Sequence, residues 1–305
     1  MDSIISCVCL LGIFCAFITI ILNINLIKRI VLKKSKRVEE MTLFYYRFVL
    51  DVVYASVLLN YVIYVLLSIH FPELMGSLRP LIVYMGLPWS NLGACRSIIA
   101  LSIAMERVIA AYFPLKYRKY RSGFPNFLVL LFALVFGLFE WPVLFGFCSY
   151  NMEIPVKCRV LGCSVSKCFY RYWAGHKAII FSTIALLSII LSIKLFIWNH
   201  FKTMSKDQKK VSKTNRLVLL GTLTVIIFDF LPSFCGKIWP EFPLFDFAYV
   251  GPYNPVLKVT GCAIEAIIVT SILLPKGLVT VVSSKRSSKM KPSDANISSY
   301  RSSLF

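Results

Sequence analysis

The sequence predicts an all-α integral membrane protein: one bundle of seven transmembrane helices, N-terminus outside and C-terminus in the cytoplasm. Three observations indicate this fold class, namely the composition, the number of long apolar runs, and the alternation of positive charge between the connections. Hydrophobic residues make up 58% of the 305 residues and charged residues only 16%. Soluble domains are roughly 45–50% apolar and about 25% charged, so this chain carries too few charges to cover a water-facing surface.

Seven apolar runs are close to the length of about 20 residues that a helix needs to cross a bilayer. They cover residues 4–27, 48–69, 81–105, 127–147, 178–198, 217–235 and 256–279. Residues 1–282 are therefore expected to form one transmembrane domain, which leaves no room for a separate enzyme or nucleic-acid-binding module. The first run lacks a preceding basic segment and a cleavage site, so it is interpreted as a retained span rather than a signal peptide.

The Lys and Arg residues of the connections predict the orientation, because cytoplasmic loops carry an excess of them. Alternate connections hold 21 Lys and Arg residues on the side of the C-terminus and 6 on the side of the N-terminus. An odd number of spans is needed to keep this alternation. The basic side is suited to anionic membrane lipid or to an acidic cytosolic partner. The Ser- and Lys-rich tail 283–305, which is predicted to be disordered, offers nine serines for phosphorylation.

Charged residues inside the runs are candidates for function, because each costs roughly 3 kcal/mol in hydrocarbon unless it is paired or hydrated. Arg96 precedes Arg107 by eleven residues, or about 16 Å of helix, which places Arg96 near the bilayer centre. We expect Asp229 or Glu265, at middle depths of the last two runs, to neutralise it. Asp51 shares a helical face with Arg47. A structural ion pair and a ligand-binding network both remain open.

Four cysteines fall in the connection after the fourth run, namely Cys148, Cys158, Cys163 and Cys168. This connection is expected outside, in an oxidising compartment, so one or two disulfides are predicted, with three full pairings possible. No CxxC pair or neighbouring His pair supports a zinc site. We predict no metal, no cofactor and no enzymatic activity, because no acid, base or metal-binding set converges in the sequence pattern.

Several short motifs resemble those of the rhodopsin-like G protein-coupled receptors. Glu106-Arg107 is followed by Ala110 and Pro114 at the family's spacing, with Val108 in place of the usual Tyr. Asp229-Phe230-Leu231-Pro232 is similar to the Cys-Trp-Leu-Pro motif, with Phe230 at the place of the toggle aromatic, and Asp51 resembles the family's second-span Asp. The sequence departs from the pattern at 274–278, where only Pro275 is kept, and has no Cys near the start of the third run.

A closer resemblance is to the nematode serpentine chemoreceptors of class BC, through residues 105–115, 194–199 and 251–258. The resemblance implies a plasma-membrane receptor of sensory-neuron cilia that answers small environmental chemicals through a heterotrimeric G protein. It also implies that Glu106 and Arg107 form the G protein switch. In such a receptor, the Ser-rich tail 283–305 would bind a receptor kinase and arrestin. The alternative is a small polytopic transporter or ion channel. The sequence contains no inverted repeats, which argues against this alternative.

Overall fold

The computed structural model describes residues 2–32, 42–121, 125–155, 158–201, 219–238 and 250–273, and within these ranges the regular structure is entirely helical. The predicted tail 283–305, the motif at 274–278, and most of the basic connections after the first and fifth runs lie outside the described residues.

Long helices occupy the regions of the predicted spans. They are α1 (Asp2–Leu32), α2 (Thr42–His70), α4 (Leu81–Tyr112), α6 (Asn126–Leu138), α9 (Lys167–Phe201) and α13 (Tyr253–Leu273). The fourth span continues from α6 through α7 (Glu140–Pro142) into the π-helical turn η3 (Val143–Phe147). The sixth region is a shorter apolar helix, Leu219–Cys235, which contains the π-helical turn η4 (Ile226–Phe230) and continues into α11 (Leu231–Ile238).

Five helices among the described residues are long and apolar enough to cross a bilayer, fewer than the seven runs of the sequence. The helix at 219–235 is too short to be counted with them. The helix α4 has 32 residues, but its polar and charged side chains make it less apolar than the five helices that are counted. Much of α4 is covered by other helices, which allows it to contain small and polar residues such as Ser90, Asn91 and Ser97.

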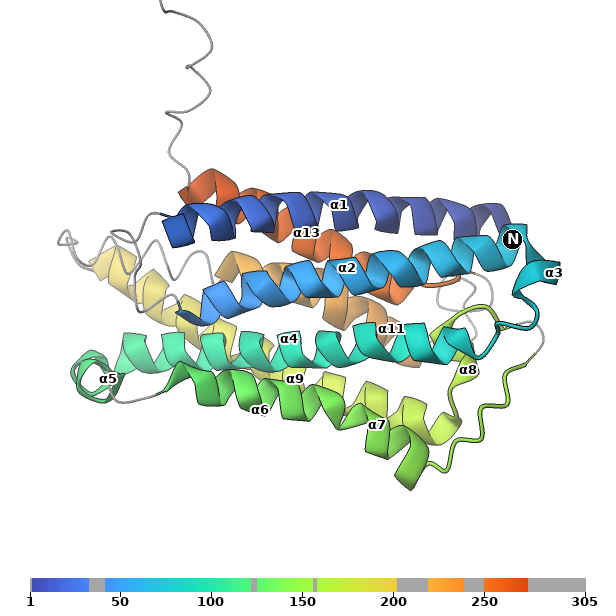
Figure 1. The fold of residues 1–305 in the computed structure, drawn as a ribbon. Helices are drawn as coiled ribbons and strands as arrows, with labels where there is room; N and C mark the ends of the chain where they lie inside the picture. The colour runs from blue at the N-terminus through green and yellow to red at the C-terminus, as the bar shows by residue number, and fades with distance from the viewer. Residues whose placement is uncertain are drawn as a thin grey trace, which may run out of the picture.

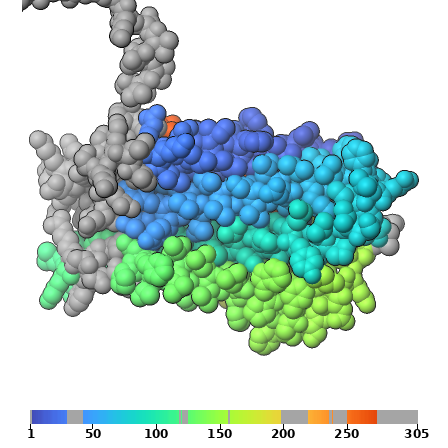
Figure 2. Space-filling model, in the orientation of Figure 1, coloured from blue at the N-terminus to red at the C-terminus, as the bar shows by residue number. Residues whose placement is uncertain are grey.

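The long helices pack side by side as one bundle. In Figure 1, α1 lies against α2 and α13, α2 lies against α4, and α4 lies against both α6 and α9. Figure 2 shows α1, α2, α4 and α6 as successive layers on one face of the molecule. Short helices mark the two ends: α3 (Pro72–Met75) and α8 (Leu161–Ser164) lie at the end that holds the N-terminus, and α5 (Pro114–Arg121) lies at the other (Figure 1).

Large apolar side chains cover much of the outside of the bundle. Phe14, Phe132 and Ile179 are 64%, 60% and 70% exposed. In water such a surface would aggregate, whereas in a bilayer it faces lipid at no cost. Inside, two apolar clusters divide the bundle along its length, one around Tyr61 and one around Phe48.

The cysteine-rich connection is shorter than the sequence suggested, because α9 begins at Lys167, eleven residues before the predicted span at 178. The structure joins Cys148 to Cys168, which ties the end of η3 to the first turn of α9. It also joins Cys158 to Cys163 around α8. Of the three possible pairings, this one encloses the short cysteine loop within the longer one.

Candidate functional site

One guanidinium group in the middle of the bundle contacts three carboxylates from three other elements. The Nε of Arg96, on α4, donates to Oδ1 of Asp51 on α2 at 2.5 Å. One terminal nitrogen donates to Oε2 of Glu265 on α13 at 3.1 Å, and the other lies 3.5 Å from Oδ2 of Asp229 on η4. The sequence predicted that Asp229 or Glu265 would neutralise Arg96. Both contact it, and Asp51, which was not expected as a partner, lies nearest.

Two further cations complete this cluster. Arg47 pairs with Glu265 rather than with Asp51, its neighbour on the same helical face. The Nζ of Lys258 lies 3.4 Å from Oδ1 of Asp229 and donates to the carbonyl of Gly93 at 3.4 Å. We call the set of three cations and three carboxylates the ion network; its members are Arg47, Asp51, Arg96, Asp229, Lys258 and Glu265. None of them is more than 6% exposed.

The ion network lies where the two apolar clusters meet. On α2, Asp51 falls between Leu50 of one cluster and Tyr54 of the other. Buried charges cost several kcal/mol each, which their mutual attraction offsets only when the pairing is complete. Because three positive groups face three negative ones, the network balances its own charge and links α2, α4, η4 and α13.

A π-helical turn places Asp229 in this network. The turn η4 ends at Phe230, and Pro232 follows within the first residues of α11. Both features disturb the regular backbone pattern, and π-helical turns are common at functional sites. Phe230 itself lies outside the network: its ring stacks on Phe234 with centroids 5.2 Å apart.

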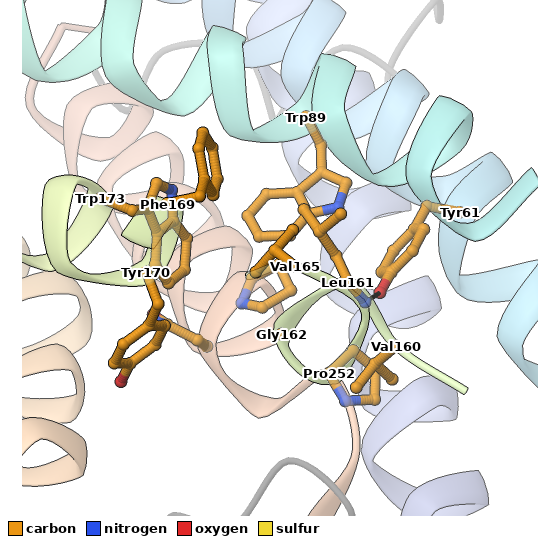
Figure 3. Close-up of a pocket in the computed structure, with 12 residues that line it drawn as sticks. Tyr61, Trp89, Val160, Leu161, Gly162, Val165, Phe169, Tyr170, Trp173 and Pro252 are labelled. Atoms are coloured by element: carbon orange, nitrogen blue, oxygen red, sulfur yellow. Dashed lines mark hydrogen bonds between the residues drawn. The ribbon is translucent and has the colours of Figure 1, made fainter. Parts of the chain in front are cut away.

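A pocket lined by aromatic residues lies near the N-terminal end of the bundle, and we call it the aromatic pocket (Figure 3). It lies between α2, α4, α8, α9 and the start of α13, and its cavity volume is about 20 Å³. Trp89 is central, with its ring centroid 5.8 Å from that of Tyr61 and 6.4 Å from that of Trp173. The backbone N–H of Leu161 donates to the hydroxyl of Tyr61 at 2.8 Å, which fixes the cysteine-rich connection over this pocket (Figure 3).

A second, smaller and more polar cavity of about 10 Å³, the charged cavity, lies between the aromatic pocket and the ion network. It shares Trp89, Asn254 and Pro255 with the aromatic pocket. It is also lined by Asp229 and Lys258, which belong to the network. The aromatic pocket is therefore separated by only a few shared side chains from the groups that link four elements of the bundle.

The candidate switch residues lie apart from this site, at the other end of α4. Glu106 accepts a hydrogen bond from the hydroxyl of Tyr117 on α5. Arg107 is 3% exposed, and its guanidinium lies 5.9 Å from the ring centroid of Phe44. The structure thus brings Asp51, Arg96, Asp229 and Glu265 together, and leaves Glu106 and Arg107 as a separate pair of positions.

Sequence reasoning missed three buried charged residues near the site. Lys258 is a member of the ion network, and Lys177 lines the charged cavity. Glu140 is 0% exposed. With its amide turned to satisfy its neighbours, Asn91 donates to Glu140 at 3.0 Å, and His176 faces the same carboxylate at 3.8 Å. Their position inside or at the edge of apolar runs was a signal that could have identified them.

A helical bundle with an exposed apolar surface and charges buried in its interior is that of a multi-pass membrane protein. A family model described as the serpentine type 7TM GPCR chemoreceptor Srbc matches residues 1–277. The chain therefore belongs to this nematode family of seven-transmembrane chemoreceptors, which confirms the family that the short motifs indicated. A comparison with curated proteins finds no match.

Proposed function

We propose that this receptor detects a small environmental chemical in the aromatic pocket and the charged cavity, and signals to a heterotrimeric G protein. The observation that carries the proposal is the shared lining of the charged cavity: Asp229 and Lys258 belong both to the cavity and to the ion network. A ligand with different affinity for two arrangements of this network shifts the receptor between them.

The turn η4 is the element through which such a shift acts. A polar ligand group near Lys258 competes with Asp229 for that ammonium group. Asp229 then holds α4 and α13 less tightly, and α11 turns about the π-helical and proline positions. Rearrangement at the far end of α4 releases Arg107, as the resemblance to rhodopsin-like receptors implies, and gives the G protein access.

The proposed topology has seven spans, with α4 and the helix at 219–238 supplying the two that hydropathy alone does not count. The N-terminus, the aromatic pocket and both disulfides lie outside the cell, where disulfides form and persist. The cytoplasm contains the opposite end of the bundle, with α5, and also the C-terminal tail. There, basic residues such as Lys116 and Lys119 face anionic lipid, and the tail serines serve a receptor kinase and arrestin. The site of action is the ciliary membrane of sensory neurons.

The test uses membranes that contain the full-length chain, purified heterotrimers of each Gα class, and a library of small volatile and water-soluble compounds. We expect at least one compound to accelerate nucleotide exchange on one class. Arg107→Ala, compared at equal surface level, should abolish this response, whereas Tyr84→Ala should keep it because that side chain is 49% exposed on the outside of α4. A compound-dependent conductance without nucleotide exchange in any class would favour the channel alternative.

A further inference from the structure

A third cavity, larger than the two inside the bundle, lies on its side between α9 and α11. We call it the lateral cleft, and its cavity volume is about 280 Å³. It is lined by Ala174, Ala178, Phe181, Phe230, Ser233, Phe234 and Ile238. The aromatic pocket and the charged cavity, at about 20 and 10 Å³, have room for about one water molecule each. The lateral cleft, unlike them, can take an organic molecule without rearrangement.

Small side chains on α9 create the lateral cleft. Ala174, Ala178 and Phe181 follow one another at intervals of four and three residues, so they share one face of this helix. On the other side, the rings of Phe230 and Phe234 stack with centroids 5.2 Å apart. Two alanines opposite an aromatic pair leave space that larger side chains would fill, and packed proteins rarely keep voids larger than a water molecule. The cleft is therefore filled by lipid or by a ligand.

The lateral cleft opens toward the surroundings of the bundle. Phe234 and Ile238, on its α11 side, are 42% and 48% exposed. Ile179, the neighbour of Ala178 on α9, is 70% exposed. Because such large apolar side chains face lipid in a bilayer, a molecule dissolved in the membrane can reach the cleft from the side.

The lining of the lateral cleft favours uncharged molecules. Six of the seven described side chains that line it are hydrocarbon, and none is charged. The exception is Ser233, whose hydroxyl contacts the side-chain amide of Asn254 on α13 through long hydrogen bonds of 3.4 and 3.5 Å. Such weak contacts allow the hydroxyl to turn to an oxygen of a ligand. A charged group would lose its hydration in the cleft without gaining a counter-charge.

Two aromatic side chains of the lining connect the lateral cleft to the ion network. Phe181 also lines the charged cavity, and its ring centroid lies 5.8 Å from Nζ of Lys258. Phe230 directly follows Asp229 and ends η4. A molecule that contacts both rings therefore acts on Lys258 and Asp229, which form one ion pair of the network. This position distinguishes the cleft from the rest of the exposed apolar surface, and it favours a ligand over structural lipid.

We infer that the lateral cleft binds a small, uncharged and largely apolar organic molecule with one hydrogen-bonding oxygen, which enters from the membrane and bonds to Ser233. The inference rests on the proposed function for the effect on signalling, and it deepens that function by naming the ligand class and the route of entry. An apolar cavity of about 150 Å³ holds one benzene molecule, so about 280 Å³ corresponds to about ten non-hydrogen atoms. The bound molecule presses Phe181 toward Lys258 and shifts that cation relative to Asp229.

The experiment labels the purified full-length chain in nanodiscs, without a G protein. The probe is 3-azioctanol, an eight-carbon alcohol that carries a photoreactive diazirine, and mass spectrometry locates the label. We expect a saturable label within residues 174–181 and 230–238 that octan-1-ol competes away. Octanoate and octylammonium should compete less well by about 10-fold or more, after correction for their concentrations in lipid measured with empty nanodiscs.

One pair of variants tests the space in the cleft. Ala178→Leu fills it and should weaken octanol binding by about 10-fold or more. The Tm of this variant without ligand should not fall, because the added side chain enters open space, and this result shows that the variant folds. A lower Tm would show that the space is not open. Ile179→Leu, at the neighbouring outward position, should leave octanol binding unchanged.

A second pair of variants tests the hydrogen bond. Ser233→Ala should weaken octanol binding by about 3-fold or more. It should leave the binding of octane, which has no oxygen, unchanged, and this difference separates a lost hydrogen bond from a distorted cleft. Ser271→Ala is the control, because that hydroxyl is exposed and bonds back to the carbonyl of Ile267 in its own helix.

Four outcomes would overturn the inference. They are a label that does not saturate or lies outside the cleft, equal competition by octanoate, unchanged affinity in Ala178→Leu, and displacement of the probe by phospholipid chains but not by octanol. The last outcome would assign the cleft to lipid. Because the assay contains no G protein, saturable binding without nucleotide exchange in any class would refute the proposed signalling and leave this site intact. Exchange driven by a compound that does not compete with the probe would refute this site alone.

Discussion

Replacing Arg96 with Met keeps an unbranched side chain of similar length and removes the positive charge from the centre of the ion network. Two carboxylates retain a cation after this change, because Glu265 still faces Arg47 and Asp229 still faces Lys258. Asp51 retains no cation, because its other polar contact among the described residues is the thiol of Cys262, at 3.9 Å. The loss of one partner from a buried pair costs about 3–5 kcal/mol, and here this cost should arise almost entirely at Asp51.

The structure therefore predicts which second substitution restores stability. Asp51→Asn in the Arg96→Met background removes the unpaired carboxylate and should recover about 2 kcal/mol or more. Asp229→Asn or Glu265→Gln should recover nothing, because it leaves Lys258 or Arg47 without its carboxylate as well. The assay is reversible unfolding of the purified receptor in mixed micelles, with surface level in cells as a second readout. Equal rescue by Asn at 229, or a free energy of unfolding unaffected by Arg96→Met, would refute the proposed pairing.

Three further predictions concern other parts of the molecule. Tags at the N-terminus, after Lys206 and at the C-terminus should be accessible in intact cells only at the N-terminus. Gly137→Ala should destabilise the receptor by about 1–3 kcal/mol, because its Cβ would lie 2.6 Å from the carbonyl oxygen of Asn91 and also meet Cys95. Loss of the Cys148–Cys168 disulfide should cost about 1 kcal/mol more than loss of the other disulfide, because the linked residues are 20 rather than 5 apart.

Each of these predictions has a control or a contradicting result. An accessible tag after Lys206 would reverse the topology and remove the proposed G protein interface from the cytoplasm. Gly146→Ala is the control for Gly137→Ala, because no atom lies within 4 Å of its added Cβ. A gain in stability in both glycine variants would show that helix propensity rather than packing decides. For the disulfides, paired Ser variants are compared by unfolding, and equal costs would contradict the loop-length argument.

The sequence predicted which charged residues lie inside the bundle, because charges are rare inside apolar runs. Arg96, Asp229 and Glu265 stood out in this way, and the structure brings all three together. The helical class also followed from composition, since a bilayer requires every backbone polar group to be satisfied within helices or a closed barrel. The family followed from short motifs around Arg107, and the family comparison confirms it.

The pairing within the network could not be predicted, because it depends on the rotation of each helix about its own axis. Asp51 and Arg47 are one turn apart on α2, yet they bind different partners on different helices. The same holds for the disulfides, because spacing alone does not distinguish three pairings of four cysteines. Lys177 directly precedes the predicted span at 178, and only the extension of α9 to Lys167 places it inside the bundle.

The polar composition of α4 bears on how the chain enters the membrane during synthesis. A helix centred on an arginine is inserted poorly by itself, at a cost of about 2.5–3.5 kcal/mol for that residue. The carboxylate that lies nearest to Arg96 belongs to α2, the preceding long helix, and the two helices are joined by a short connection that contains α3. We therefore expect α2 and α4 to leave the translocon as a hairpin, with the charge of each already neutralised by the other. Substitutions at Asp51 would then reduce the yield of inserted receptor before they affect its response to any chemical.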